Sequence, residues 1–518
     1  MSAGKVLGMI FLAKIMKNEY RDSVFLMRIN DQVERMPGVK RAAVMMGTDA
    51  NKDLMKEAGL YIDQVKDAGP NDLVIVLEAD DKGSAEEALS KAQELTSKVE
   101  RETRIEEEPY RSLRSAVAFE PDIDLVLIST PGEYAYREAM RSLLLGKHVM
   151  VFSSNVPIEK EIRLKELAER KNLLVMGPDA GTAIVSGVGL GFFNVVKDGP
   201  VGIVGAAGTG IQEVSSVLGL SGVGISAAIG TGSNDISETI GGKTMLMGLN
   251  MLDLYDGTKT ITIISKPPSK SVAEKVVQKA HESKKPVILN FIGNEDFSPS
   301  GNVDFAFTLE EAAYKSHLKA TGKEMKLADW VNPDKLKEVS DMLRPDQRFV
   351  RGLFSGGTIN YESQAIFKRS GRSVWSNSAL DKSKKIGGFD NSKDDTFIDM
   401  GSEEYVRGVP HPMIDFRFRK ERILKEAQDP SVGVILLDII LGYGANMDPA
   451  SEIAESVSRV RAFNKSLIFI SSIVGTESDP QDINKQVKTL TNAGVIVTPT
   501  SARAADIALK IIERRWKA

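Results

Sequence analysis

The sequence feature that most constrains the fold is a strand–turn–helix pattern that occurs twice. One copy runs from Val201 to Glu213 and the other from Arg351 to Glu362. In each copy a short apolar run leads into small residues and a Gly-Thr pair, and a glutamate follows the threonine by one helical turn. The apolar run predicts a strand, and the glycines predict a tight turn into a helix. The chain is therefore expected to contain two similar α/β domains.

Stretches further along the chain support a tandem duplication. The apolar run Thr260–Ser265 corresponds to Gly433–Asp438, and Pro286–Phe291 corresponds to Leu467–Ser472. Helical patterns separate these runs in both halves, and strands that alternate with helices favour a parallel sheet. We therefore expect the same order of elements in both domains.

The N-terminal part divides into two further units. Residues 1–110 are expected to form a small α/β, ferredoxin-like domain, with a strand at Ser23–Arg28 and a helix at Ser84–Lys98 that its first residue caps. A charged linker at Glu100–Glu108 then leads to a second unit of alternating strands and helices at 111–196. The predicted fold class is thus a multidomain α/β protein.

The duplicated domains are expected at 197–320 and 349–518. A polar stretch at 321–348 with few apolar runs predicts a surface linker between them. Within the second domain, the polar segment Arg372–Asp395 predicts a flexible loop.

Composition excludes several function classes. The 518-residue chain has a formal net charge of -4, which argues against non-specific binding to nucleic acid or to anionic membranes. It has no cysteine, so disulfides, zinc–thiolate sites and cysteine nucleophiles are excluded, and a reducing cytoplasm is the expected location. The four histidines are scattered, so no metal site is expected. The apolar stretch Val6–Ala13 is too short to span a bilayer and lacks a signal-peptide cleavage pattern.

The two glycine-rich turns are candidate anion sites. Backbone N–H groups at a helix start have no partner within the helix, and they favour an anion at that end of the helix. An alternative is that the glycines serve close packing alone, but the second copy leads us to favour anion binding. The candidate phosphate- or anion-binding residues of the two turns are Gly205, Gly208, Thr209 and Gly210, and Ser355, Gly356, Gly357 and Thr358.

Other strand ends extend this candidate site. Gly232 and Ser233 follow a predicted strand and either bind the anion as well or cap a helix. Because ligands of parallel sheets sit beyond the carboxyl ends of the strands, Thr130-Pro131 and Gly177-Pro178 are candidate edges of a substrate site.

Two side chains are candidates for catalysis. Lys266 ends a predicted strand and is followed by Pro267 and Pro268, so it either neutralises a phosphate or carboxylate or is a solvated lysine in a rigid turn. His411 is held between Pro410 and Pro412, which suits a donor to an oxyanion or an acid–base group. The more frequent role of such a histidine is structural, with a hydrogen bond to a backbone carbonyl.

Several motifs together resemble the succinyl-CoA synthetase superfamily. They are the Gly-Ile-Val…Gly-Thr…Glu pattern at Gly202–Glu213, the strand end Gly177-Pro178, and the run Val432–Asp438. More narrowly, Pro410–Asp415 and Leu441–Ala445 are similar to signatures of the FdrA family. The resemblance covers most of the chain, from about Leu113 to its end.

This resemblance implies a truncated Rossmann-like CoA-binding-type domain at 111–196, followed by two flavodoxin-like ligase domains. Members are acyl-CoA synthetase-like, and some are linked to a carbamoyltransferase that acts on oxamate with companion subunits. The chain departs from succinyl-CoA synthetases at Ile292–Phe297, where their phosphohistidine loop has a histidine and this sequence has none. No ATP-grasp domain is evident.

Three functions are therefore expected from the sequence. The first is acyl or carbamoyl transfer to or from phosphate, with a small anionic substrate such as carbamoyl phosphate and no firmly implied cofactor. The second is a subunit of an ADP-forming acyl-CoA ligase that uses CoA and needs a partner chain. The third is a non-catalytic scaffold or sensor. The resemblance also implies a homo-oligomer or companion subunits.

Overall fold

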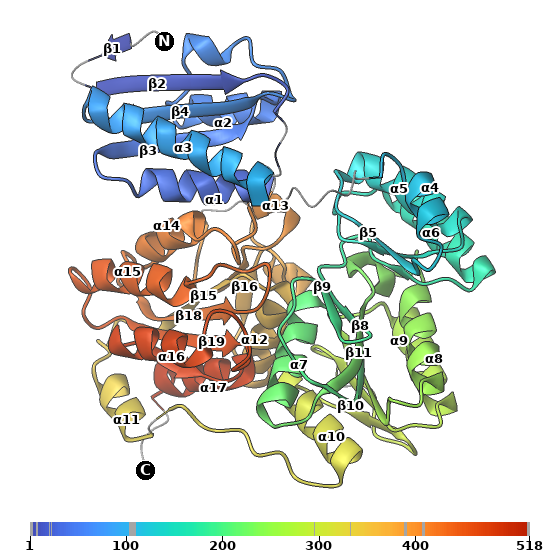
Figure 1. Ribbon diagram of the computed structural model, residues 1–518. Helices are drawn as coiled ribbons and strands as arrows, with labels where there is room; N and C mark the ends of the chain where they lie inside the picture. Colours follow the sequence, from blue (N-terminus) through green and yellow to red (C-terminus); the bar gives the residue numbers. More distant parts are fainter. Residues whose placement is uncertain are drawn as a thin grey trace. The chain divides into compact units, whose positions relative to one another are not determined.

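The computed structural model describes residues 4–6, 9–19, 21, 23–102, 110–294, 296–331, 333–387, 391–406 and 410–514. The chain separates into two compact units, one formed mainly by Met1–Tyr110 and the other by most of Arg111–Ala518 (Figure 1). Most of the linker predicted at Glu100–Glu108 lies outside the described residues, whereas helix α3 continues to Glu102.

The N-terminal unit is a four-stranded antiparallel sheet in the order β1-β2-β4-β3. Helices α1 and α3 cover one face of it, while α2 and the short helix η1 pack on the other. Strand β4 is buried along its whole length because both faces are covered. The elements are β1 Gly4–Val6, β2 Met9–Met16, α1 Ser23–Glu34, β3 Val39–Met46, α2 Asp49–Glu57, η1 Asp63–Val65, β4 Leu73–Ala79 and α3 Lys82–Glu102.

Two predictions for this unit are wrong. Ser23–Arg28 is the first part of helix α1 rather than a strand, because Leu26, Ile29 and Val33 recur at helical spacing and bury one face. A short apolar window does not distinguish the spacing of buried residues in a helix from that in a strand. Helix α3 starts earlier than predicted, and Asp81, not Ser84, accepts the hydrogen bond at its start, from the backbone N–H of Ser84 at 3.0 Å.

The second unit begins with a small three-stranded parallel sheet in the order β5-β6-β7. A hairpin, β8–β9, then joins the edge of the next sheet through β11. These elements are α4 Leu113–Phe119, β5 Leu125–Ile128, α5 Gly132–Leu144, β6 His148–Val151, α6 Ile158–Lys171, β7 Val175–Met176, β8 Thr182–Val185 and β9 Val188–Gly191.

The seven-stranded sheet has the order β14-β13-β12-β10-β11-β8-β9. Its five parallel strands, β10 to β14, are ordered as in flavodoxin-like sheets, with the strand order reversing beside β10. The elements are β10 Asp198–Ala206, α7 Gly208–Leu220, β11 Ile225–Gly230, η2 Ser233–Ile236, α8 Lys243–Leu254, β12 Thr260–Ser265, α9 Lys270–Glu282, β13 Val287–Phe291, β14 Val303–Phe305 and α10 Leu309–Thr321.

The six-stranded sheet repeats this arrangement. It is parallel throughout, in the order β16-β17-β15-β18-β19-β20, so β15 corresponds to β10 and α12 to α7. The elements are β15 Phe349–Phe354, α12 Gly357–Arg369, β16 Val374–Ser376, η3 Lys382–Lys384, β17 Asp395–Asp399, α13 Glu403–Val406, α14 Arg417–Glu426, β18 Val432–Ile440, α15 Pro449–Arg461, β19 Ile468–Val474, α16 Ile483–Asn492, β20 Ile496–Thr498 and α17 Ser501–Ile512.

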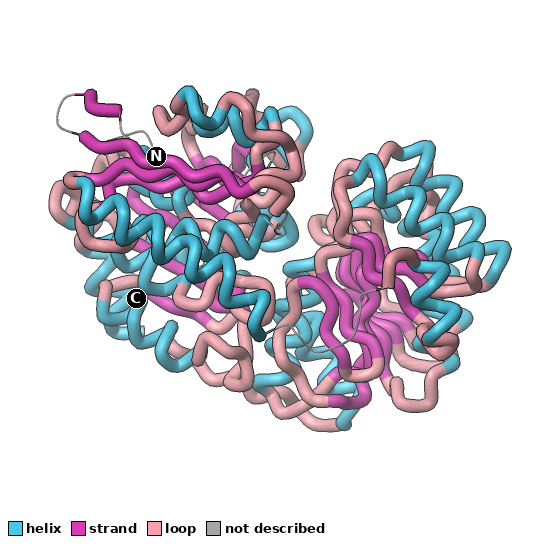
Figure 2. Tube along the Cα trace, turned by 45° about the horizontal axis from the view of Figure 1, so that its top comes forward, coloured by secondary structure: helices cyan, strands magenta, loops and turns pink. Residues whose placement is uncertain are grey.

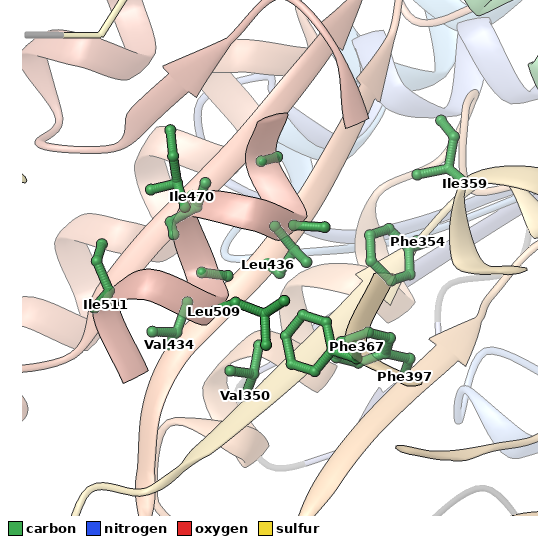
Figure 3. Close-up of a cluster of buried hydrophobic side chains, with 14 of the residues drawn as sticks. Val350, Phe354, Ile359, Phe367, Phe397, Val434, Leu436, Ile470, Leu509 and Ile511 are labelled. Carbon is green, nitrogen blue, oxygen red and sulfur yellow. The ribbon is translucent and has the colours of Figure 1, made fainter. Parts of the chain in front are cut away.

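Strands form inner layers, and helices cover them (Figure 2). One face of the six-stranded sheet buries a core in which Phe354, Phe367 and Phe397 pack edge to face (Figure 3). Such aromatic packing fixes the first turn of α12, because Phe354 is the last residue of β15. Among the described residues, every helix is too short or too polar to span a bilayer.

Two segments predicted to be irregular contain regular structure. The predicted linker at 321–348 includes α11, Pro333–Asp341, and Leu336 and Leu343 bury against the second domain's core. The predicted loop Arg372–Asp395 supplies the edge strand β16 and the η3 turn. Both segments are polar overall, but a few apolar side chains suffice to anchor them.

Candidate functional site

The starts of α7 and α12 lie against each other. A Cβ atom built on Gly356 would lie 2.6 Å from Thr209 Oγ1, and a Cβ built on Gly210 would lie 2.8 Å from Thr358 Cγ2. Each threonine therefore packs on the glycine of the other turn, and neither glycine position has room for a side chain. The duplication thus brings its two matched Gly-Thr turns to one place.

Both helices start with unpaired amides. Among the described residues, the backbone N–H groups of Gly208 and Thr209 in α7, and of Gly357 and Thr358 in α12, have no protein acceptor. The hydroxyl of Thr358 is buried and also has no partner. Each helix starts where the strand order of its sheet reverses, which is the position where parallel α/β sheets bind ligands.

A small cavity of about 30 Å³ opens at the start of α7. It has room for about one water molecule. Its walls come from the ends of β10, β11 and β12 and from the turn before β8. The lining residues are Asp179, Ala180, Gly181, Thr182, Gly205, Ala206, Ala207, Gly208, Gly230, Gly232, Ser233 and Lys266.

Lys266 lies between the two helix starts. It lines the cavity at α7, and a Cβ built on Gly357, the first residue of α12, would lie 3.2 Å from its Nζ. The same Cβ position is 2.5 Å from Oδ2 of Asp399, which ends β17. Burial raises the pKa of Asp399, and the nearby charge of Lys266 opposes this rise. The site therefore brings the ammonium group of Lys266 close to the buried carboxyl group of Asp399.

The amides that precede α12 are already occupied by a carboxylate. Asp438, on β18, accepts hydrogen bonds from Ser355 N at 2.8 Å, Ser355 Oγ at 2.9 Å and Gly356 N at 3.0 Å. Arg419 donates to the same carboxylate at 2.6 Å. The predicted anion-binding roles of Ser355 and Gly356 are thus filled from within the chain, whereas Gly357 and Thr358 stay open.

His411 lies next to Gly401 and outside the small cavity. Its Nδ1 accepts a hydrogen bond from Met413 N at 3.3 Å, and its Nε2 lies 2.7 Å from a Cβ position built on Gly401. Burial lowers the pKa of His411 to about 4, although Asp438 opposes this shift. The ring is therefore neutral near pH 7, and it is not among the residues that line the small cavity.

The remaining predicted residues divide into two groups. Gly232 lines the small cavity, and a Cβ on it would lie 2.2 Å from the Pro178 carbonyl and 2.8 Å from Gly177, so Gly177 and Pro178 pack against Gly232 without lining the cavity. Ser233 Oγ donates to Asp179 at 2.5 Å. Thr130 and Pro131 are exposed at the end of β5 and do not line the cavity.

A larger cavity of about 530 Å³ lies next to the start of α12, and sequence reasoning missed it. It is lined by Tyr361, Asn377, Ser378, Ala379, Lys382, Lys385, Ser402 and Glu404. Ser378 donates to Asp399 at 3.2 Å and so links this cavity to the site at Lys266. Three lysines at positions 382, 384 and 385 were the available signal, but they lie in the predicted loop Arg372–Asp395.

The chain contains domains of the CoA-binding and CoA-ligase types. The family profile described as CoA-ligase matches residues 353–511, and the one described as CoA binding domain matches 196–293. The latter match falls on the seven-stranded sheet. A third profile, described as AllF, heavy metal-associated domain, matches residues 9–110.

The chain belongs to the same family as the Escherichia coli (strain K12) protein named "Uncharacterized protein YahF". The two are 37% identical over 506 residues, which cover 96% of this chain and 98% of the relative. A subunit alpha of succinate–CoA ligase [ADP-forming] from Methanothermobacter thermautotrophicus is 28% identical over 112 residues, or 21% of this chain and 38% of that protein. The family is thus succinyl-CoA ligase-like.

Solved structures show lower similarity. A dinucleotide-forming acetyl-coenzyme A synthetase 1 from Ca. Korarchaeum cryptofilum is 16% identical, with a TM-score of 0.28 over 76% of this chain and 83% of that chain. An ATP citrate lyase from Methanothrix soehngenii is 17% identical, with a TM-score of 0.32 over 41% of this chain and 37% of that chain.

The name of the N-terminal profile refers to a heavy metal, but the residues present do not fit one. The chain has no cysteine to supply thiolate ligands. Within the described ranges, no group of three or more His, Asp or Glu side chains is arranged to hold a metal ion. No step of the chemistry is therefore assigned to a metal in this domain.

Proposed function

We propose that the chain binds one phosphate- or carboxylate-bearing substrate between the starts of α7 and α12, and that it takes part in acyl or carbamoyl transfer to or from phosphate. The observation that carries this proposal is the packing of Thr209 on Gly356 and of Thr358 on Gly210. Each helix start favours an anion, and two starts at one place act on the same ligand.

The unpaired amides and Lys266 would hold the phosphate. The cavity of about 30 Å³ takes only part of such a group, so its other oxygens would face Lys266 and Gly357. During transfer, a phosphate oxygen bonds to the acyl or carbamoyl carbon, and the bond from that carbon to the leaving nitrogen or sulfur breaks as the leaving group takes a proton. Pre-aimed donors stabilise the negative charge that develops. No protein nucleophile is needed, which suits a chain without cysteine.

The FdrA resemblance of Pro410–Asp415 and Leu441–Ala445 supports the carbamoyl-transfer form of this proposal. The CoA binding and CoA-ligase matches support a second candidate, an ADP-forming ligase subunit that uses CoA and a separate nucleotide-activating chain. The loop after β13 has no histidine at Ile292–Phe297, so we do not assign a phosphohistidine relay there. Both candidates include companion subunits or self-association.

Isothermal titration calorimetry with inorganic phosphate, carbamoyl phosphate, CoA and ATP tests the proposal. Binding of phosphate and carbamoyl phosphate in competition with each other supports the first candidate. Heat from CoA, followed by phosphate transfer from ATP when partner chains are added, supports the second. No heat from any of the four compounds contradicts both.

Variants then locate the site. Thr209→Val and Thr358→Val keep the side-chain shape and remove one hydroxyl each, so phosphate affinity should fall by about tenfold per variant. The matched control is Thr491→Val, an exposed threonine in α16. Unchanged affinity in both site variants would place the anion elsewhere and favour a scaffold.

A further inference from the structure

The two glutamates of the duplicated motif meet at one serine in the interior. Ser501, the first residue of α17, has its Oγ 2.8 and 2.7 Å from the two carboxyl oxygens of Glu213. The same Oγ makes a very short hydrogen bond with Glu362. Both glutamates are 0% exposed. The transfer chemistry proposed above gives them no role.

Counting protons shows that this cluster holds one more proton than two ionised carboxylates would. A serine hydroxyl has a single proton to donate, and an ionised carboxylate can only accept. Ser501 Oγ contacts both carboxyl groups, so one contact must be donated by a carboxyl O–H. Each glutamate also accepts one backbone N–H, Glu213 from Ser501 at 2.8 Å and Glu362 from Leu309 at 2.6 Å, so the two carboxyl groups share the extra proton.

The surroundings favour retention of this proton. Glu310, on α10, faces both glutamates and adds negative charge, but Arg503 of α17 pairs with it, with its Nη2 at 2.6 Å. Thr500 Oγ1 also donates to Glu310 at 2.6 Å. Burial raises the pKa of Glu213 well above its usual range and that of Glu362 to about 7.

The cluster links the two halves crosswise. Glu213 lies on α7 and accepts from the first amide of α17, whereas Glu362 lies on α12 and accepts from Leu309 N, the first amide of α10, at 2.6 Å. Each glutamate thus ties a helix of one half to a helix of the other. Both are one helical turn beyond the threonines that interlock at the helix starts.

We propose that Glu213, Ser501 and Glu362 form a proton-sharing bridge that positions the starts of α7 and α12, so that anion binding weakens as the bridge loses its proton. The effect on binding rests on the proposed function, whereas the effect on stability does not. The folded chain retains a proton that the unfolded carboxylates release near their ordinary pKa. The stabilisation is therefore complete below the ordinary glutamate pKa and is lost as pH rises through the raised folded pKa values of the pair, about 7 for Glu362 and well above the usual range for Glu213.

The test compares the full-length chain with Glu362→Gln between about pH 6 and about pH 9. Glutamine carries an N–H donor toward Ser501 and a carbonyl acceptor toward Leu309, so it mimics the protonated bridge without titrating. Sulfate is the probe because it stays a dianion over this range. In the original chain the thermal midpoint should fall and sulfate affinity should drop by about tenfold as pH rises. In Glu362→Gln both profiles should depend less on pH, because only Glu213 of the pair still titrates.

Two further variants complete the design. Glu166→Gln, at an exposed glutamate of α6, is the matched control and should keep the original pH profiles. Ser501→Ala removes the shared hydroxyl and should lower the thermal midpoint most at low pH, where the protonated bridge is intact. A Glu362→Gln chain with the original pH dependence of stability overturns the bridge. Sulfate that fails to bind at any pH contradicts the proposed function, while the stability profiles still decide the bridge.

Discussion

The contact between Gly356 and Thr209 provides the sharpest test of the shared site. Alanine at position 356 would place its Cβ 2.6, 2.7 and 2.8 Å from Thr209 Oγ1, Cγ2 and Cβ. The backbone at Gly356 has φ -112° and ψ 117°, which alanine adopts freely, so the effect of Gly356→Ala is steric. Contacts this short force a displacement, and overpacking of this kind costs about 1–3 kcal/mol.

Because Thr209 is in the first turn of α7, the displacement moves amides that we assign to the anion. Loss of one hydrogen bond to a charged group costs about 1.5–3 kcal/mol, so sulfate affinity should fall by at least about tenfold. Calorimetry measures this loss, and thermal unfolding measures the stability. Gly387→Ala is the control, since its Cβ would meet open space without a positive φ.

A double variant checks the cause. Thr209→Gly removes all three contacting atoms, and glycine in the helix costs about 1 kcal/mol of stability. Gly356→Ala combined with Thr209→Gly should therefore lose less stability than the sum of the losses in the two single variants. If Gly356→Ala has the same thermal stability and the same sulfate affinity as the original chain, the two turns do not interlock and the shared site is wrong.

Further predictions concern the charges at the site. Lys266→Met should weaken phosphate binding by about tenfold, measured by calorimetry, because it removes the ammonium between the two helix starts; equal affinity would show that the amides alone hold the anion. Asp438→Asn should destabilise the second domain by about 3–5 kcal/mol in urea denaturation, because buried Arg419 loses its charge partner; a loss below about 1 kcal/mol would contradict this. The depressed pKa of His411, about 4, means that stability falls as pH drops from 6.5 toward 4, and NMR titration of its ring should give a midpoint near 4 rather than near 6.5.

The sequence was sufficient to predict the two helix starts. Glycines and apolar runs determine these turns locally, and α7 and α12 begin at Gly208 and Gly357, within the predicted turns. That Thr209 meets Gly356 could not be read from the sequence, because it depends on how the duplicated domains pack. Binding by these residues stays a prediction.

Other residues of the site could not be identified from the sequence, because their neighbours in the chain gave no sign of a polar role. Asp438 lies within an apolar strand, after its first six residues, and carried no signal that it fills the amides before α12. Asp399 likewise ends a buried strand. The roles of Glu213 and Glu362 required the position of Ser501, which is far from both in the chain.

The carboxylate of Asp438 has a consequence for the whole molecule. It accepts hydrogen bonds from the amides before α12, whereas among the described residues no carboxylate bonds the amides at the start of α7. The two duplicated turns therefore differ in how many of their amides are open to a ligand. Titration should therefore saturate at a single equivalent of ligand for each polypeptide, which the start of α7 shares with the amides of Gly357 and Thr358 that Asp438 leaves open.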